Sequence, residues 1–237
     1  MKLPGIAKNA AWKALFVLSP NWYEREKSQR LGFAYPEYFD ITRSIFVHVP
    51  KAAGTSISLA IYGRQIDSHP WPAWYDLNPR KFGSYYKFAV IREPISRFVS
   101  AFSFLKRGGL NDWDKSFAEK TLKPYDDPNQ LAMALIDGHV QNAILQWEHF
   151  RPQVEYVADA NGRSKMDLLF RFEDLEAGFE LVCHKLGLER KLPRFNNGQS
   201  KASPLNEDAL EVLRCIYRSD LALYREIRPI QKTINGE

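Results

Sequence analysis

The segment 44–56 constrains this chain more than any other. Its first six residues, SIFVHV, are mostly apolar and typical of a buried β-strand. Pro50 and Lys51 follow, then three small residues and two hydroxyl residues. An apolar-periodic stretch at 57–62 continues from there and predicts a helix. The sequence therefore predicts a strand, a tight loop and a helix N-terminus in direct succession.

Such a loop suits an anion. The first N–H groups of a helix have no partner within the helix, and the helix dipole is positive at that end. Lys51 adds a full charge, and Thr55 and Ser56 can cap the helix or bond oxyanion oxygens. An ordinary capped βα turn has the same pattern, so this segment alone leaves both interpretations open. It is not a Walker A loop, because Lys51 precedes Gly54 instead of following two glycines.

A second strand–helix unit lies further along the chain. Residues 86–91 are typical of a buried strand, Arg92 ends it, and a helix is expected from about 95 to 106 with Pro94 in its first turn. A guanidinium at the carboxyl end of a strand, beside a hydroxyl such as Ser100 on the next helix, can form a second phosphate seat. A surface Arg and an ordinary helix Ser are the alternative.

The rest of the chain continues the alternation of strands and helices. We expect strands at 154–157 and 166–172, helices at 129–137, 139–147, 173–186 and 205–226, and irregular loops at 64–84 and 110–128. This pattern predicts an α/β fold, a three-layer domain with a mostly parallel central sheet flanked by helices. Residues 1–43 are expected to be an N-terminal helical and irregular extension, and residues 44–237 the α/β domain.

Composition and charge limit the kinds of binding partner and the cellular compartment that we expect. A formal net charge of +5 suits an anionic nucleotide or an acidic substrate, but it is too small and dispersed for nucleic acid. No stretch approaches the roughly 20 apolar residues of a membrane span. We expect residues 1–20 to form an amphipathic helix, with a signal sequence as the alternative and a weak membrane-surface contact left open. These features favour a cytoplasmic protein, with a membrane-peripheral one as the alternative.

Cysteine and histidine patterns give no metal site. Cys183 and Cys215 lie in apolar, helix-like settings and are expected to be buried free thiols, not a disulfide. No CxxC or HExxH pattern occurs.

The two phosphate-seat motifs together resemble the sulfotransferase family, and the carbohydrate sulfotransferases most. The matching residues are Lys51, Gly54, Thr55 and Ser56 in the first motif and Arg92 and Ser100 in the second. The resemblance implies that the first motif holds the 5′-phosphosulfate of 3′-phosphoadenosine 5′-phosphosulfate (PAPS), and the second its 3′-phosphate. Weaker similarity at 149–153, 170–175 and 196–201 extends the resemblance over about 44–225.

The resemblance implies a P-loop-NTPase-like fold and an in-line sulfuryl transfer from PAPS to a hydroxyl of a carbohydrate or glycoconjugate. Lys51 would stabilise charge on the leaving phosphate, and backbone N–H groups from Ala53 to Ser56 would hold the 5′-phosphate. Lys201 could contact the nucleotide phosphates, although a solvated Lys is the other interpretation. The product would be adenosine 3′,5′-bisphosphate, and no metal is required.

The acceptor hydroxyl needs a general base, for which His is the usual residue near neutral pH. His69 lies between the two motifs, in the interval where the resembled enzymes place a catalytic His. A loop histidine without a catalytic role, or a base such as Asp67 or Asp76, is the alternative. His48 is expected to be structural, and His139, His149 and His184 have unremarkable helical settings. Trp71, Trp74 and Tyr75 could stack on a sugar or simply pack.

Two other functions stay open at this point. One is a small-molecule kinase on a related fold, which the missing Walker pattern disfavours. The other is a nucleotide- or glycan-binding protein without turnover, which the intact Lys51, Arg92 and Ser100 disfavour. The acceptor is expected to be a glycan or a small hydroxylated molecule, and the sequence predicts neither its identity nor an oligomeric state.

Overall fold

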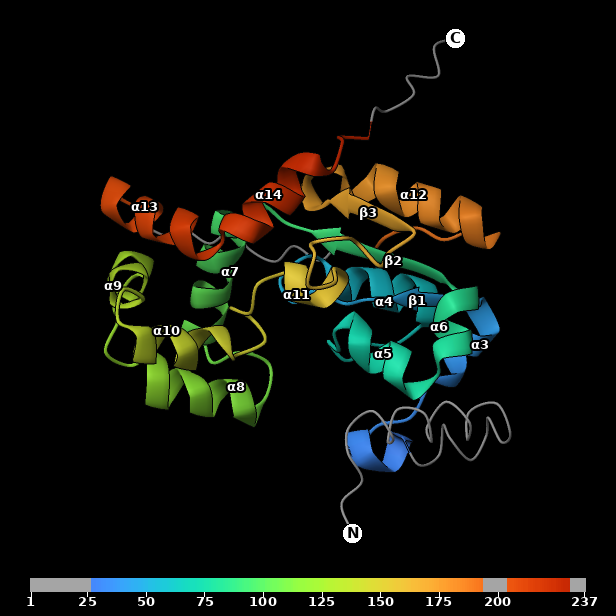
Figure 1. Ribbon diagram of the computed structural model, residues 1–237, viewed down its shortest axis with the longest axis horizontal. Helices are drawn as coiled ribbons and strands as arrows, with labels where there is room; N and C mark the ends of the chain where they lie inside the picture. The colour runs from blue at the N-terminus through green and yellow to red at the C-terminus, as the bar shows by residue number, and fades with distance from the viewer. Residues whose placement is uncertain (1–26, 194–203, 231–237) are drawn as a thin grey trace.

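The structure is a computed structural model and describes residues 27–193 and 204–230. In this part of the chain three parallel strands form one sheet in the order β1-β2-β3, with β1 at Ser44–Phe46, β2 at Tyr86–Ile91 and β3 at Leu168–Arg171. Parallel neighbours need long crossover connections, and helices supply them here (Figure 1). The predicted α/β class with a parallel sheet is confirmed.

The helices surround this sheet and extend beyond it. In chain order they are α3 (Glu37–Thr42), α4 (Gly54–Tyr62), α5 (Trp71–Leu77), α6 (Pro79–Ser84), α7 (Pro94–Lys106), α8 (Asp112–Phe117), the π-helix η1 (Ala118–Leu122), α9 (Pro128–Ala134), α10 (Gly138–Leu145), α11 (Val154–Val157), the 3₁₀-helix η2 (Phe172–Asp174), α12 (Leu175–Leu186), α13 (Glu207–Ile216) and α14 (Arg218–Glu226).

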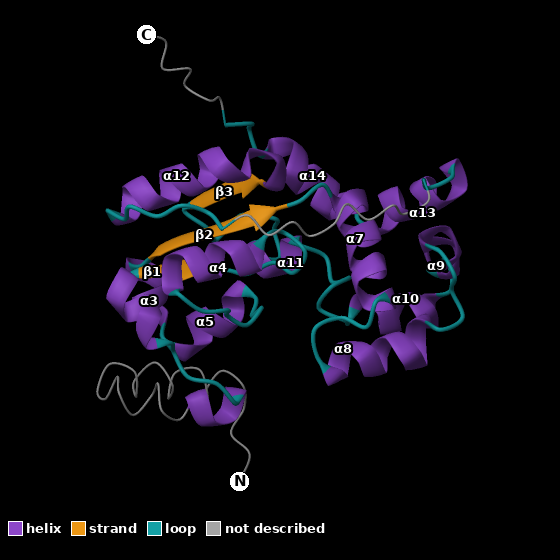
Figure 2. Cartoon of the chain, turned by 180° about the vertical axis from the view of Figure 1, so that it is seen from behind, coloured by secondary structure: helices purple, strands orange, loops and turns teal. Residues whose placement is uncertain are grey.

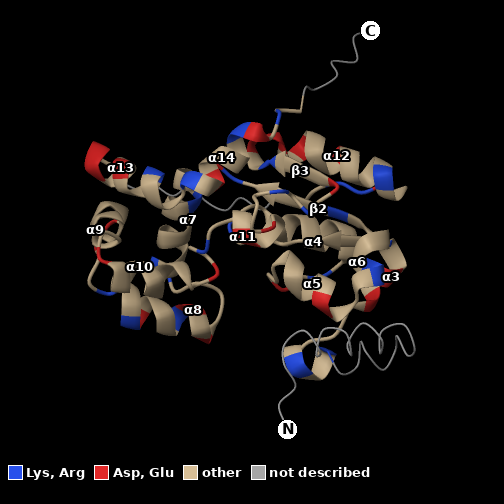
Figure 3. Ribbon diagram, in the orientation of Figure 1, with Lys and Arg blue, Asp and Glu red and all other residues tan. Residues whose placement is uncertain are grey.

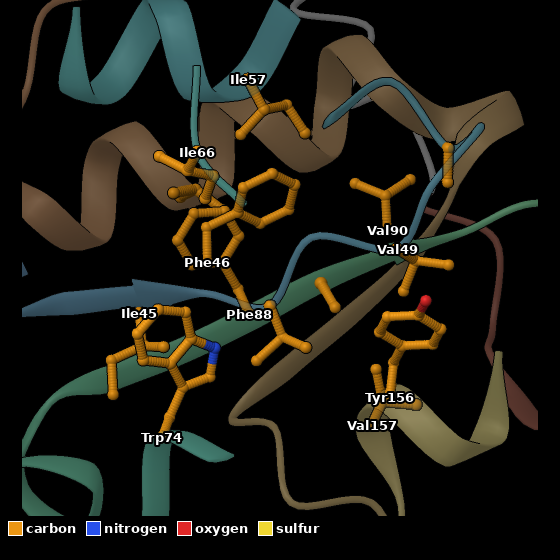
Figure 4. Packing of buried hydrophobic residues seen from close by; sticks show 14 of the residues in the cluster. Ile45, Phe46, Val49, Ile57, Ile66, Trp74, Phe88, Val90, Tyr156 and Val157 are labelled. Atoms are coloured by element: carbon orange, nitrogen blue, oxygen red, sulfur yellow. The ribbon is translucent and has the colours of Figure 1, made fainter. Parts of the chain in front are cut away.

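Helices cover both faces of the sheet. Ile57 of α4 lies on one side of the strands, whereas Trp74 of α5 and Tyr156 of α11 lie on the other (Figure 4). Phe88 in the central strand is fully buried between them. Strands buried on both faces are apolar at nearly every position, which explains why β2 shows no alternation of apolar and polar residues.

A second hydrophobic cluster lies beside the sheet. Its buried residues come mainly from α7, α9, α10 and α13, with Phe98 and Leu213 among them. These helices group together at one end of the molecule in both views (Figures 1 and 2). Because α7 begins directly after β2, this helical group is attached to the carboxyl end of the sheet.

Residues just before β1 pack on the sheet. Tyr35 and Phe39 belong to the same hydrophobic cluster as Ile45, and Asp40 pairs with Lys81 at 2.8 Å and accepts a hydrogen bond from Tyr85. Lys, Arg, Asp and Glu occur on the sheet layers and on the helical group alike (Figure 3). The positive excess is therefore dispersed over the molecule.

Three sequence predictions of local structure are wrong. Residues 154–157 form α11 instead of a strand, because the Asp220 carboxylate accepts the N–H groups of Gln153 and Val154 and so supports a helical turn. Residues 64–84, expected to be irregular, contain α5 and α6, each with a proline at its start. Residues 110–128 contain α8 and η1.

The two cysteines differ in burial. Both are free, but only Cys183 is buried, and Cys215 is exposed, contrary to the prediction. Cys215 lies on the outer face of the amphipathic helix α13, whose buried residues are Ala209 and Leu213. Among the helices described, none combines the length and apolar character needed to cross a membrane.

Candidate functional site

The loop between β1 and α4 has an alternating backbone. Lys51 and Ala53 have positive φ angles of 68° and 63°, whereas Ala52 and Gly54 do not. Left-handed backbone at a residue with a Cβ costs about 1–2 kcal/mol. Alternation of this kind turns successive N–H groups toward one point and forms an anion-binding concavity. Backbone of this kind is concentrated at active sites and ligand clamps, which makes this loop a candidate site.

The start of α4 adds to this concavity. Its N-cap residue, Ala53, makes no side-chain capping bond, and the first helical hydrogen bond runs from the Ile57 N–H to the Ala53 carbonyl. The N–H groups of Gly54, Thr55 and Ser56 thus have no partner within the helix. Loop and helix together present the backbone donors that a phosphate or sulfate needs.

Gly54 is required because of His48. A Cβ at position 54 would overlap the Cδ2 and Nε2 atoms of the His48 ring. His48 Nδ1 lies 3.2 Å from the Ile66 carbonyl, which can only accept, so Nδ1 carries the proton. Burial lowers the pKa of His48 to about 4, and the ring is neutral at physiological pH. The neutral His48 ring therefore packs directly against Gly54 and holds the loop in place.

Lys51 is a cation held in a partly buried, electropositive setting. Its Nζ lies 3.6 Å from the centre of the Phe104 ring. Burial, together with the nearby Arg107 and Arg92, lowers the pKa of Lys51 to about 8. A cation destabilised in this way gains from an anion placed beside it. The structure thus favours a negatively charged ligand at the end of Lys51.

Arg92 connects the two motifs. It follows β2, and its Nη1 donates to the Lys51 carbonyl at 3.3 Å while its Nε donates to Ser96 at 3.2 Å. The guanidinium also lies over the Phe172 ring, 4.7 Å from its centre. Ser100 is partly buried two turns further along α7. The parallel register of β1 and β2 therefore brings both phosphate-seat motifs to the same edge of the sheet.

Gln153 positions Arg92 through the backbone, which the sequence did not indicate. The fully buried Gln153 side chain accepts the Arg92 N–H at 3.0 Å and donates to the Arg92 carbonyl at 2.8 Å. Asp220, also fully buried, accepts the Gln153 N–H at 2.7 Å. The partners lie 61 and 67 residues apart in the chain, so only the similarity at 149–153 could have pointed to Gln153.

Arg97 is a second residue that sequence reasoning missed. Its side chain is 1% exposed and donates to the carbonyls of Pro50 at 2.8 Å, Arg151 at 2.9 Å and Glu148 at 3.3 Å. One guanidinium thus joins the anion-binding loop to the segment 148–151. The fork-shaped donor set of Arg suits this role, and Lys could not replace it.

A cavity of about 610 Å³ opens beside Lys51 and Thr55. Segments far apart in the sequence form its walls, among them 48–58, 65–70, 110–114 and 148–151. The cavity is of the size that small-molecule sites have. It places the anion-binding loop next to a space that can hold a second reactant.

His69 projects from the wall of this cavity. Its ring stacks on Phe33 at 3.9 Å and meets Trp74 edge-on at 5.4 Å. Trp74 also donates to the His69 carbonyl at 3.2 Å. Burial lowers the pKa of His69, while Asp67 and Glu148 act in the opposite direction. Burial thus favours the neutral ring, and within the described residues neither ring nitrogen has a hydrogen-bond partner, so His69 can accept a proton.

His149 lines the same cavity but is engaged otherwise. Its Nε2 lies 3.1 Å from an Asp114 oxygen, and its Nδ1 is buried without a partner in the described part of the chain. Burial lowers the pKa of His149, and Asp114 opposes this effect. Because Nε2 is paired with Asp114 and Nδ1 is buried, His149 is a weaker candidate for a base than His69. Asp114, Glu148 and His149 also bring potential metal-ligand atoms within 4.8 Å of one another.

Several other residues proposed from the sequence lie away from the cavity. Asp76 is exposed on α5 and does not line it, whereas Asp67 does. Trp74 is buried, Trp71 donates to the Ala158 carbonyl at 2.8 Å, and Tyr75 is exposed outside the cavity. A sugar-stacking role for these three aromatic residues is therefore not supported. Lys201, with the segment 196–201, lies outside the described residues.

Comparison with known proteins adds one finding. A family model described as "Sulfotransferase family" matches residues 42–225, which include both phosphate-seat motifs and the cavity segments 48–58, 65–70, 110–114 and 148–151. No curated protein and no solved structure gives a significant match.

Proposed function

Because this chain belongs to the sulfotransferase family, we propose that it transfers a sulfuryl group from PAPS to a hydroxyl of a carbohydrate or glycoconjugate. The observation that carries this proposal is the hydrogen bond from Arg92 to the Lys51 carbonyl. It ties two anion-binding elements together beside one cavity. A ligand with two phosphate groups would engage both elements, and a nucleotide with a single phosphate site would leave one unused.

The donor would supply the sulfuryl group, and the residues of this chain would hold and polarise it. The backbone from Ala53 to Ser56 presents its N–H groups to the 5′-phosphate, and Lys51 balances the charge that develops on the leaving oxygen. Arg92, with Ser100, holds the 3′-phosphate. Catalysis of this kind consists mainly of positioning and charge stabilisation, as in phosphoryl transfer.

His69 acts as the base in this proposal. Its neutral ring faces the cavity in which the acceptor hydroxyl would lie, and Phe33 and Trp74 fix its orientation. A neutral imidazole can take the hydroxyl proton as the new S–O bond forms.

Transfer of labelled sulfate from PAPS to a panel of sugars tests the activity. Lys51→Ala should lower kcat by about 10²–10³, the loss typical of one charge-stabilising donor. Lys120→Ala removes an exposed lysine of η1 and serves as the control. Circular dichroism checks that both variants fold. Full turnover in Lys51→Ala would refute the role given to Lys51.

The base is tested separately. His69→Asn should lower kcat by about 10²–10⁴, as loss of a general base does, and leave the affinity for adenosine 3′,5′-bisphosphate unchanged. His139→Asn changes an exposed histidine of α10 and should have no effect. If His149→Asn abolished transfer and His69→Asn did not, the assignment of the base would be wrong.

A further inference from the structure

Resting on this proposed function, we infer that the acceptor site selects a neutral or amine-bearing hydroxyl compound and disfavours an anionic one, with Glu148 as the residue that sets this preference. The charges that line the cavity carry the inference. Three carboxylates line it, from Asp67, Asp114 and Glu148, and two basic side chains, from Lys51 and Arg151.

The two basic residues differ in how far they can serve the acceptor. Lys51 belongs to the β1–α4 loop that would hold the sulfuryl donor, and it is packed on Phe104. Arg151 donates to the Gln146 carbonyl at 3.2 Å and lies 3.8 Å from a Glu155 oxygen, so part of its charge is balanced outside the cavity. Among the described residues that line the cavity, three carboxylates therefore face the acceptor against the single remaining cation, Arg151.

Glu148 is the carboxylate best placed to contact the acceptor. Its side chain is 41% exposed, accepts a hydrogen bond from Ser68, and has an oxygen 3.9 Å from His149 Nε2. Ser68 precedes His69, so the carboxylate lies next to the loop that carries the base. Asp114, by contrast, is buried and accepts from the Leu110 N–H and from His149.

The electrostatic effect of Glu148 extends across the cavity. Its charge raises the pKa of His48, of His69 and of His149, in each case against the larger effect of burial. A negative charge that acts on all three histidines also acts on any group bound among them. It stabilises a hydroxyl or ammonium donor and repels a carboxylate or sulfate.

Three sugars that share one ring test the inference. Methyl glucoside is neutral, methyl glucosaminide carries an amine and methyl glucuronide carries a carboxylate. Their binding to the complex of the full chain with adenosine 3′,5′-bisphosphate is measured by ligand-observed NMR. The first two should bind at least about 10-fold more tightly than the third, with a smaller difference at high salt.

Glu148→Gln removes the charge and keeps an acceptor for Ser68. It should reduce the discrimination against the glucuronide at least about 3-fold, because the repelling charge is lost. Glu211→Gln, on the exposed face of α13, should leave it unchanged. Equal or tighter binding of the glucuronide, or no binding of any ring, would overturn the inference.

Discrimination against the glucuronide that is undiminished in Glu148→Gln would also overturn the role of Glu148. The binding measurement involves no sulfate transfer. Loss of turnover and loss of this preference are therefore separate results. The transfer assay can refute the proposed activity while the binding preference is still observed, and the binding assay can refute the preference while transfer is still observed.

Discussion

Gln153→Met should weaken both the fold and the nucleotide site. Met has nearly the length of Gln but neither donates nor accepts as Gln does, so the Arg92 N–H and carbonyl each lose a partner at 3.0 Å and 2.8 Å. A polar group left without its partner in a buried site costs about 1–3 kcal/mol. Two such groups, with partial relaxation, should lower the free energy of unfolding by about 2–4 kcal/mol.

The same substitution releases the backbone from which the Arg92 side chain extends. A charge-assisted hydrogen bond contributes about 1.5–3 kcal/mol, and losing about half of it should lower bisphosphate affinity about 4- to 10-fold. Guanidinium chloride unfolding followed by tryptophan fluorescence measures the first effect, and titration calorimetry measures the second.

Gln130→Met is the matched control. Gln130 is exposed on α9, where its side chain accepts the Asp126 N–H at 2.9 Å. Water can replace this bond, so the change in unfolding free energy should stay within about 0.5 kcal/mol. If Gln153→Met and Gln130→Met had the same free energy of unfolding, the buried hydrogen bonds of Gln153 would contribute less to stability than their geometry implies. Lower stability with unchanged affinity for the bisphosphate would instead show that Arg92 does not hold the 3′-phosphate.

Two further predictions concern the anion-binding loop. Gly54→Ala should destabilise the protein by about 1–3 kcal/mol through overlap with His48, and the loss should largely disappear in the His48→Ala background. Additive effects in this double-mutant cycle would exclude the packing explanation. Lys51 has a pKa of about 8, set by burial and by Arg107, Arg92 and Arg97 against Asp114. A bound phosphate raises this pKa, so calorimetry should show proton uptake near pH 8–9 and weaker bisphosphate binding above pH 8. Bisphosphate affinity that does not change from pH 7 to 10 would contradict a lowered pKa for Lys51.

The sequence predicted the parts of the fold that local patterns specify. The apolar run at 86–91 is buried on both faces and forms β2, and the helix expected after Pro94 is α7. Gly187 ends α12 with a positive φ of 65°, as its position indicated. In each case the signal lies within a few residues of the element that it determines.

Long-range contacts explain what the sequence did not predict. The β-forming residues Val154 to Val157 become helical because Asp220 supplies an acceptor from 66 residues away. Arg97 donates to backbone carbonyl groups at three separate positions. Every residue has a backbone carbonyl, so the residue types at these positions could not indicate the acceptors. The proposal of His69 as the base came from its place between the two motifs, but its stacking on Phe33 depends on the segment before β1.

Titration calorimetry with adenosine 3′,5′-bisphosphate and adenosine 5′-monophosphate tests the central claim, that two linked seats hold two phosphate groups. The bisphosphate should bind about 100-fold more tightly, since Arg92 would contribute a charge-assisted contact to the 3′-phosphate. Arg92→Met should remove most of that difference while leaving the monophosphate affinity nearly unchanged. Equal affinities of the wild-type protein for the two nucleotides would contradict the account.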